Sequence, residues 1–292
     1  MISFKDILEL IKFNITILVL VTCYIGYYLG LRHVDLKMVE FESWITFVFL
    51  ILGTFLSSSG ASMLNQYIER EFDAKMERTK NRPLPSKIVK PNTVLFFGLI
   101  LSILGPFIFY VKINILTSLI SFITIFTYVC IYTPSKRYTS LNTIIGSIPG
   151  ALPPVGGWAA ATGELSIETF TLFGVLFCWQ IPHFLSLAII YKEDYKKGGF
   201  KMLPSITDDK NQITFQILFF TMALVYSSIG IYILNLTSFL YVVGAVVLGL
   251  IFLFYSSYIL FDYSPKSIKR IFLFSIIYLP ILLIMILLDA IF

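Results

Sequence analysis

The stretch NQYIEREFDAKMERTKNRPLP, residues 65–85, follows a long apolar segment and decides how the chain is interpreted. Asn65, Glu69 and Asp73 stand four residues apart, and each such step on a helix advances the side chain by only about 40° around the axis. We therefore expect the three side chains to leave one face of a helix. Two carboxylates and an amide are oxygen ligands of the kind that Mg²⁺ binds when phosphates complete its shell. This face is a candidate catalytic and metal-binding site.

Basic residues follow the acidic face closely. Arg78, Lys80 and Arg82 are candidates for binding phosphate oxygens, for which the planar fork of Arg is well suited. The alternative is a solvated helix end with pairs such as Glu71 with Lys75, in which the cations only anchor the chain at a membrane surface. The alignment of three ligand-type groups favours function. A membrane helix that ends in such a cluster suggests an enzyme that handles a lipid diphosphate.

The composition indicates a membrane protein. The chain has 292 residues and a mean hydropathy of +0.85, with 57% hydrophobic and 13% charged residues, which is outside the range of a soluble domain. We predict one all-α, polytopic helical bundle formed by residues 1–292. About nine apolar stretches are long enough to cross a bilayer, near residues 12–30, 45–65, 92–111, 113–132, 141–161, 167–190, 212–234, 238–260 and 271–291. The fifth is rich in Pro and Gly, which predicts a kinked or broken helix.

The positions of the basic residues predict the orientation in the membrane. With the N-terminus in the cytoplasm, all of the 22 Lys and Arg residues except Arg32, Lys37 and Lys112 fall on the cytoplasmic side. This asymmetry explains the net charge of +5 without a nucleic-acid partner. The first residues show no signal-peptide pattern. We expect a multi-pass protein of a bacterial plasma membrane whose site-bearing loops face the cytoplasm.

Two further polar loops lie on that side, TPSKRYTSLN at 133–142 and YKEDYKKGGFKMLP at 191–204. All three loops can converge over a single cavity. The second of these loops offers Glu193 and Asp194 as metal ligands, but adjacent residues of a helix point about 100° apart. One is therefore expected to bind metal and the other to pair with a lysine. Further candidates for binding diphosphate are Lys136, Arg137, Lys197 and Lys201.

His183 is the only histidine within an apolar segment, and it follows Pro182, where a helix loosens. Ionisable groups at membrane depth are candidates for function. The alternative is a histidine that hydrogen-bonds to a neighbouring helix. Gln180 shares the same environment.

These motifs resemble the UbiA superfamily of intramembrane prenyltransferases. The family's first motif is rich in Asn and Asp and is followed by Arg-Thr and Asn-Arg-Pro-Leu; the matching positions are Asn65, Glu69, Asp73, Arg78, Thr79, Asn81, Arg82, Pro83 and Leu84. Gln66 and Glu69 depart from the more usual Asp. The runs YTPSKRYTSLNTIIGSIPGALPPVGGW at 132–158, QIPHF at 180–184 and DYKKGGFKMLP at 194–204 are similar to the protoheme IX farnesyltransferase branch. The superfamily's second motif has two Asp four residues apart, and Tyr191 and Tyr195 stand at those places.

The resemblance implies transfer of farnesyl from farnesyl diphosphate to a vinyl group of heme b, with Mg²⁺ as the cofactor. It implies His183 and Gln180 as heme contacts, with His183 as a candidate iron ligand. It also implies heme A synthase or assembly proteins of terminal oxidases as partners. Two alternatives stay open, a prenyltransferase for an aromatic quinone precursor and a transporter. The QIPHF and GALPPVGGW runs disfavour the first, and the absence of paired charges within the apolar segments disfavours the second.

Overall fold

The computed structural model describes residues 3–289, and these residues form helices joined by loops. The elements are α1 (Phe4–Leu10), α2 (Phe13–His33), α3 (Phe41–Asp73), α4 (Pro91–Lys112), α5 (Ile115–Phe126), a π-helical segment (Thr127–Tyr132), α6 (Thr133–Tyr138), α7 (Asn142–Ala151), α8 (Pro153–Thr162), α9 (Ile167–Ile190), α10 (Lys192–Gly198), α11 (Leu203–Ile206), α12 (Lys210–Ile233), α13 (Phe239–Tyr258) and α14 (Pro265–Asp289).

The predicted all-α membrane bundle is confirmed. Within residues 3–289, eight helical segments are long and apolar enough to cross a bilayer, and α5, the π-helical segment and α6 together count as one of them. The predicted fifth segment, 141–161, consists of two shorter helices, α7 and α8, which meet at Leu152. Pro153 and Pro154 open α8, where their missing N–H groups cost no helical hydrogen bond. The sequence count of nine is therefore approximate, and the predicted break is observed.

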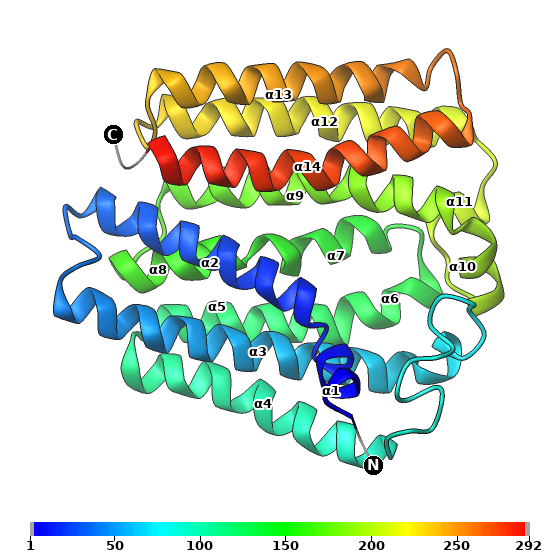
Figure 1. Cartoon of the computed structure of the whole chain (residues 1–292), viewed down its shortest axis with the longest axis horizontal. Coiled ribbons are helices and arrows are strands. Elements are labelled where there is room, and N and C mark those ends of the chain that lie inside the picture. The colour runs from blue at the N-terminus through cyan, green and yellow to red at the C-terminus, as the bar shows by residue number, and fades with distance from the viewer. Residues whose placement is uncertain (1–2, 290–292) are drawn as a thin grey trace.

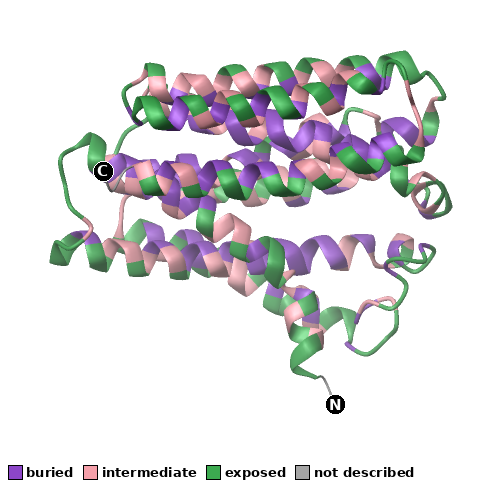
Figure 2. Ribbon diagram, turned by 45° about the horizontal axis from the view of Figure 1, so that its top comes forward, coloured by how far each residue is buried: buried purple, intermediate pink, exposed green. Residues whose placement is uncertain are grey.

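The helices form two groups with α7 and α8 between them. Figure 1 shows α9, α12, α13 and α14 on one side and α3, α4 and α5 on the other, while α2 crosses the middle at the level of α7 and α8. Helices α2 and α8 cross at very short range because Gly26 and Gly157 lie at the crossing. A Cβ on Gly26 would stand 1.9 Å from Pro154 O, and a Cβ on Gly157 would stand 1.9 Å from Cys23 O. Buried residues line the inner faces of both groups (Figure 2).

The polar connections gather at one end of the molecule, the right-hand end of Figure 1, where the loop after α3 lies near α6, α10 and α11. Two sequence boundaries change. The predicted loop at 133–142 begins as a helix, because the π-helical segment continues directly into α6. The segment predicted at 45–65 belongs to a longer helix, since α3 continues without interruption to Asp73. The whole first motif therefore stands on one rigid helix.

Candidate active site

A cavity of about 500 Å³ opens among the helices next to the polar end of the molecule. One part of its wall is charged and the rest is largely apolar. The Asp, Glu, Lys and Arg residues of the wall are Glu69, Asp73, Lys12, Arg78, Arg82 and Lys136. Four cations therefore face two carboxylates. An excess of positive charge around a partly enclosed space favours a bound anion.

Helix α3 supplies the acidic face predicted from the sequence. Asn65, Glu69 and Asp73 are 0%, 3% and 2% exposed, so the spacing of four residues does place all three side chains on a buried face. Buried polar groups need partners, and Asn65 has two. Its Oδ1 accepts a hydrogen bond from Lys12 Nζ at 2.6 Å, and its Nδ2 donates to Thr133 Oγ1 at 3.0 Å. Its oxygen is thus engaged by a cation.

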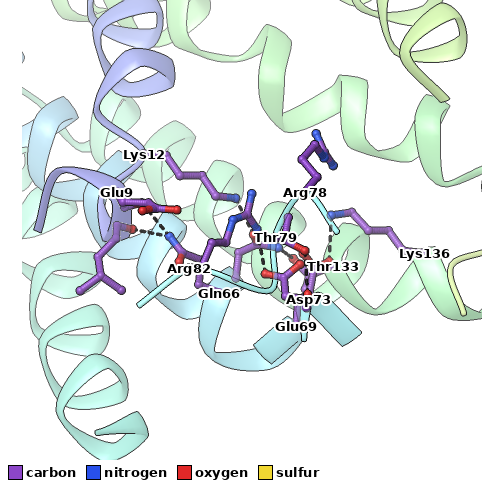
Figure 3. Close-up of polar contacts among 12 residues, drawn as sticks. Glu9, Lys12, Gln66, Glu69, Asp73, Arg78, Thr79, Arg82, Thr133 and Lys136 are labelled. Atoms are coloured by element: carbon purple, nitrogen blue, oxygen red, sulfur yellow. Dashed lines mark hydrogen bonds and ion pairs between the residues drawn. The ribbon is translucent and has the colours of Figure 1, made fainter. Parts of the chain in front are cut away.

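Each carboxylate of this face is paired with a cation from another segment. Glu69 Oε1 lies 2.8 Å from Lys136 Nζ, and Asp73 Oδ2 accepts from Arg82 Nη1 at 2.7 Å. Figure 3 shows Lys12 and Lys136 approaching the acidic face from opposite sides. Thr79 Oγ1 donates to the backbone oxygen of Asp73 at 2.8 Å and fixes the chain where α3 ends. The motif residues from Asp73 to Arg82 therefore form one charged cluster.

The donor set fits a divalent cation that is shared with a substrate. Within residues 3–289, no group of three or more His, Cys, Asp or Glu side chains lies close enough together to hold a metal ion alone. Glu69 and Asp73 offer hard carboxylate oxygens, the donors that Mg²⁺ prefers, and this ion usually keeps waters and substrate phosphates in its shell. Glu69 and Asp73 would hold Mg²⁺ here together with the oxygens of a diphosphate.

The second predicted acidic loop is arranged differently. Asp194 Oδ1 accepts from the backbone N–H of Glu77 at 3.0 Å, and Asp194 Oδ2 accepts from that of Arg78 at 3.1 Å. The Asp194 carboxylate thus ties α10 to the loop after α3. Glu193 is exposed and lies 3.6 Å from Lys196 Nζ. Neither acid belongs to the cavity wall, and metal binding by either of them stays a prediction.

The remaining basic candidates differ in their positions. Lys136 lines the cavity, whereas Lys80, Arg137, Lys197 and Lys201 do not. Lys80 pairs within its own loop, and Lys197 and Lys201 are exposed. Arg137 Nη2 donates to the backbone oxygen of Ile68 at 3.0 Å, so this side chain is bonded to the backbone of α3. Their binding of diphosphate stays a prediction.

His183 lines the cavity at the face of α9 and is clamped by aromatic rings. The Trp179 ring stacks on it at a centroid distance of 5.0 Å, and the Phe272 ring stacks at 5.1 Å. His183 Nδ1 lies 2.8 Å from Ser275 Oγ, and Ser275 Oγ donates its hydrogen to Phe272 O at 2.6 Å. Because a hydroxyl has one hydrogen, His183 Nδ1 is the donor to Ser275. The lone pair of the neutral ring is then on Nε2.

Gln180 stands one turn before His183 and also belongs to the cavity wall. Its Nε2 donates to Leu176 O at 3.0 Å and to Ser147 O at 3.3 Å, so the amide joins α9 to α7. Gly150 allows this approach, because a Cβ at that position would stand 2.0 Å from Gln180 Oε1. Gln180 and His183 thus lie on one wall of the cavity, and their contact with heme stays a prediction.

Three wall residues were missed by the sequence interpretation: Lys12, Tyr128 and Tyr132. Lys12 was counted only as a cytoplasmic cation, yet its Nζ reaches Asn65 and lies 3.4 Å from the Tyr128 hydroxyl. Lys136 Nζ lies 4.7 Å from the centre of the Tyr132 ring. A signal for the tyrosines was their spacing of four, but nothing local linked Lys12 to a residue 53 positions away.

Comparison with known proteins agrees with this geometry. Residues 19–278 match the UbiA prenyltransferase family. A protoheme IX farnesyltransferase of Solibacter usitatus is 40% identical over 294 residues, which covers 98% of each chain. The solved structure of a digeranylgeranylglyceryl phosphate synthase superposes with a TM-score of 0.81 at 20% identity and covers 98% of each chain. A UbiA homolog from Archaeoglobus fulgidus, solved with DMAPP and Mg²⁺, superposes with a TM-score of 0.65 at 14% identity, covering 96% of this chain and 99% of its own.

The solved structures support the fold. The Solibacter usitatus relative and the family match support descent from a common ancestor. Together with the long apolar helices, they identify a multi-pass membrane protein. Because the match spans most of the chain and the relative aligns over nearly its full length, this chain belongs to the UbiA prenyltransferase family.

Proposed function

We propose that this chain transfers the farnesyl group of farnesyl diphosphate to a vinyl group of protoheme IX (heme b), which gives heme O and diphosphate. The 40% identical relative carries that name over nearly its whole length. The structural observation that carries the proposal is a cavity with four cations and two carboxylates at one end, while mostly apolar side chains, together with several Ser and Thr residues, line the rest. In this proposal residues 1–292 act as one domain.

The charged end suits a diphosphate with Mg²⁺. Lys136 and Arg82 already stand 2.8 and 2.7 Å from Glu69 and Asp73. When a diphosphate enters, these cations can turn to its oxygens and leave both carboxylates to hold the metal. Mg²⁺, when bound, supplies positive charge that stabilises the departing diphosphate. The Archaeoglobus fulgidus homolog with DMAPP and Mg²⁺ supports this use of the fold.

The apolar part of the cavity suits a prenyl tail. Its wall includes Cys23, Leu50, Phe109 and Ile120, which are buried residues of α2, α3, α4 and α5. Burial of an isoprenoid chain against such residues removes apolar surface from water, which is worth about 25 cal/mol per Å². The same walls exclude water from the reactive carbon, so that an allylic cation is not quenched before it meets the acceptor.

The acceptor would lie against the α9 wall. The hydrogen bond to Ser275 holds His183 in the tautomer that leaves Nε2 without a proton. A neutral imidazole nitrogen is a common ligand of heme iron. The stacked Trp179 and Phe272 rings fix the plane of His183. We propose that His183 positions heme through its iron and that Gln180 contacts the same substrate.

The reaction breaks the C1–O bond of farnesyl diphosphate, the π bond of the vinyl group and one O–H bond of water, and it forms one C–C bond and one C–O bond while a proton is released. The C1–O bond of farnesyl diphosphate breaks, and the electron pair leaves with the diphosphate, which Arg82, Lys136 and Lys12 stabilise. The farnesyl C1 then bonds to the terminal carbon of the vinyl group. Water adds to the inner vinyl carbon and loses a proton, which leaves a hydroxyethylfarnesyl group. The tyrosine rings beside the charged end, Tyr128 and Tyr132, offer π-faces to the cationic carbon.

The membrane setting completes the proposal. We propose a bacterial plasma membrane, with the N-terminus and the loops after α3, α6 and α9 in the cytoplasm, as the distribution of Lys and Arg indicates. The apolar product would stay in the bilayer. Heme A synthase or assembly proteins of terminal oxidases are the proposed partners, since they would receive heme O.

Labelled farnesyl diphosphate tests the choice of acceptor. Purified protein with Mg²⁺ is given hemin in one reaction and an aromatic quinone precursor in another, and label transferred to each acceptor is counted. We expect label on the porphyrin alone. Label on the quinone precursor would show that this compound, and not heme, is the acceptor. Uptake of either compound into proteoliposomes without any product would favour a transporter.

A further inference from the structure

The second loop of the site holds the first loop through backbone contacts. Both oxygens of Asp194 are used, one by the Glu77 N–H at 3.0 Å and the other by the Arg78 N–H at 3.1 Å. A carboxylate that accepts two backbone donors is stabilised where it is, and it orients the chain that provides them. The consequence falls on Arg78, whose backbone is fixed at the rim of the cavity.

The Arg78 side chain rests on two tyrosines. Its guanidinium carbon lies 5.1 Å from the centre of the Tyr191 ring and 5.6 Å from that of the Tyr195 ring. Its Nη2 also donates to the Tyr195 hydroxyl at 3.2 Å. We call Tyr191, Tyr195 and Asp194 the Arg78 seat. A guanidinium has five N–H donors. The hydrogen bond to Tyr195, which also lines the cavity, occupies one of them.

The seat is anchored in a small apolar cluster. Tyr195 meets the edge of Phe200 at a centroid distance of 6.3 Å and packs against buried Met76 and Met202. Gly198 permits this close packing, since a Cβ there would stand 2.9 Å from Met76. The Tyr195 ring, against which the Arg78 guanidinium packs, is therefore held in place by this cluster. A guanidinium fixed in this way loses little conformational entropy when it binds an anion.

The seat offers poor ligands to a metal ion. Tyr191 and Tyr195 offer phenol groups, whereas Mg²⁺ usually takes carboxylates, carbonyls and water, and Asp194 is engaged by backbone donors. The neighbouring Glu193 is exposed and lies beside Lys196. A fixed Arg, in contrast, can bind two oxygens of a phosphate at once.

We propose that Arg78 on its seat supplies the positive charge at the second-loop side of the diphosphate, and that this loop binds no metal ion. The site then takes one divalent cation, at Glu69 and Asp73, and the Arg78 guanidinium supplies the positive charge on the other side of the diphosphate. This inference rests on the proposed function only in requiring a prenyl diphosphate substrate. It does not depend on the acceptor.

Metal stoichiometry tests the inference directly. Mn²⁺ binding to the purified full-length protein is counted by electron paramagnetic resonance, with saturating farnesyl thiolodiphosphate as an unreactive analogue. We expect one Mn²⁺ per chain, and two would overturn the inference. The double variant Tyr191→Asp/Tyr195→Asp supplies two carboxylates four residues apart, and we expect it to bind a second Mn²⁺. No second ion in a folded double variant would contradict the geometry assigned to this loop.

Analogue affinity tests the role of Arg78 without turnover. Arg78→Ala should raise the Kd of farnesyl thiolodiphosphate about 10- to 100-fold, the range for loss of charge-assisted hydrogen bonds. Arg78→Lys should lie between the two, because it keeps the charge and loses the planar fork. Lys75→Ala removes an exposed cation of the same loop outside the cavity and is the matched control. Equal Kd values for wild type and Arg78→Ala would overturn the inference.

The two proposals fail in different ways. If wild type binds the analogue and loses affinity in Arg78→Ala but gives no farnesylated porphyrin, the acceptor is wrong and the Arg78 inference holds. If porphyrin product forms and the Arg78→Ala variant binds the analogue normally, the function holds and the Arg78 inference fails. If wild type does not bind the analogue at all, both are wrong.

Discussion

Replacing Asp73 by Asn tests the charged end of the cavity with the smallest change of shape. The carboxylate is 2% exposed and pairs with Arg82 at 2.7 Å. The amide oxygen of Asn can still accept from Arg82, and the bond from Thr79 goes to the backbone of residue 73. The variant should therefore fold with its loop in place, while one of the two proposed anionic metal ligands becomes neutral.

The structure sets the expected size of each effect. The Arg82 side chain is 22% exposed, so water can partly solvate it, and the loss of its anionic partner should cost about 1 kcal/mol of stability. Turnover should fall much further, because the metal acts on the departing diphosphate in the transition state. Loss of one such stabilising group typically lowers kcat about 100- to 1,000-fold.

The assay is porphyrin farnesylation at saturating Mg²⁺, with thermal unfolding measured on the same samples. Glu71→Gln is the matched control, since Glu71 is an exposed acid of the same helix and pairs with Arg70. We expect the control to retain its activity. Near-normal turnover of Asp73→Asn at saturating Mg²⁺ would refute the assignment of Asp73 to the metal.

The remaining predictions concern four other residues. Glu69→Asp should lose less activity than Asp73→Asn, since it keeps the acid in the place where the superfamily more usually has Asp; an equal loss would show that reach to the metal matters more than charge. His183→Ala should raise the KM for heme and shift the absorption spectrum of bound heme, with no change for farnesyl diphosphate or iron-free protoporphyrin; a defect confined to farnesyl diphosphate would place His183 on the wrong substrate. Ser275→Ala should weaken heme binding in the same direction, because Nδ1 loses its acceptor and the tautomer is no longer fixed; unchanged heme spectra would contradict the tautomer. Gln66→Leu removes hydrogen bonds of 2.9 Å to Glu9 O and Leu10 O and should speed hydrogen exchange in α1, at a cost of about 1–3 kcal/mol for the Leu10 carbonyl, since Glu9 O keeps the Lys12 N–H; unchanged protection would refute this role.

The fold could be predicted from local patterns. A transmembrane helix needs about 20 apolar residues, and this signal survives in the sequence because lipid tolerates few alternatives. The break in the fifth segment was predictable from Pro153 and Pro154, because Pro is disfavoured in the interior of a helix and accepted in its first turn. The end of α3 was harder to place, since the helix continues past its apolar part to Asp73 and hydropathy does not report a polar helix turn.

The site was predictable only where its residues share one helix. The face of Asn65, Glu69 and Asp73 follows from a spacing of four on α3. The partner of Asn65 does not, because Lys12 reaches it from the start of α2 through tertiary packing. Asp194 illustrates the same limit: it was expected as a metal ligand, and its backbone partners on the opposing loop depend on how α10 packs.

The wall around His183 could be predicted even less, because its contacts arise from tertiary packing. Ser275 lies in a helix that hydropathy alone identified, and nothing in its neighbourhood predicts a bond to a residue 92 positions away. Aromatic residues are numerous, with 28 Phe and 17 Tyr, so composition could not separate Tyr128 and Tyr132 from those that face lipid. The structure distinguishes them, because Tyr128 and Tyr132 line the cavity.

The most direct test of the central claim is mass spectrometry of the porphyrin after incubation of purified protein with farnesyl diphosphate, hemin and Mg²⁺. The account predicts a product that has gained one farnesyl group and one hydroxyl group, with a matching isotopic shift when the reaction is run in ¹⁸O-labelled water. It also predicts that Asp73→Asn gives little of this product. Unmodified porphyrin from a folded wild-type protein that binds both substrates would contradict the account.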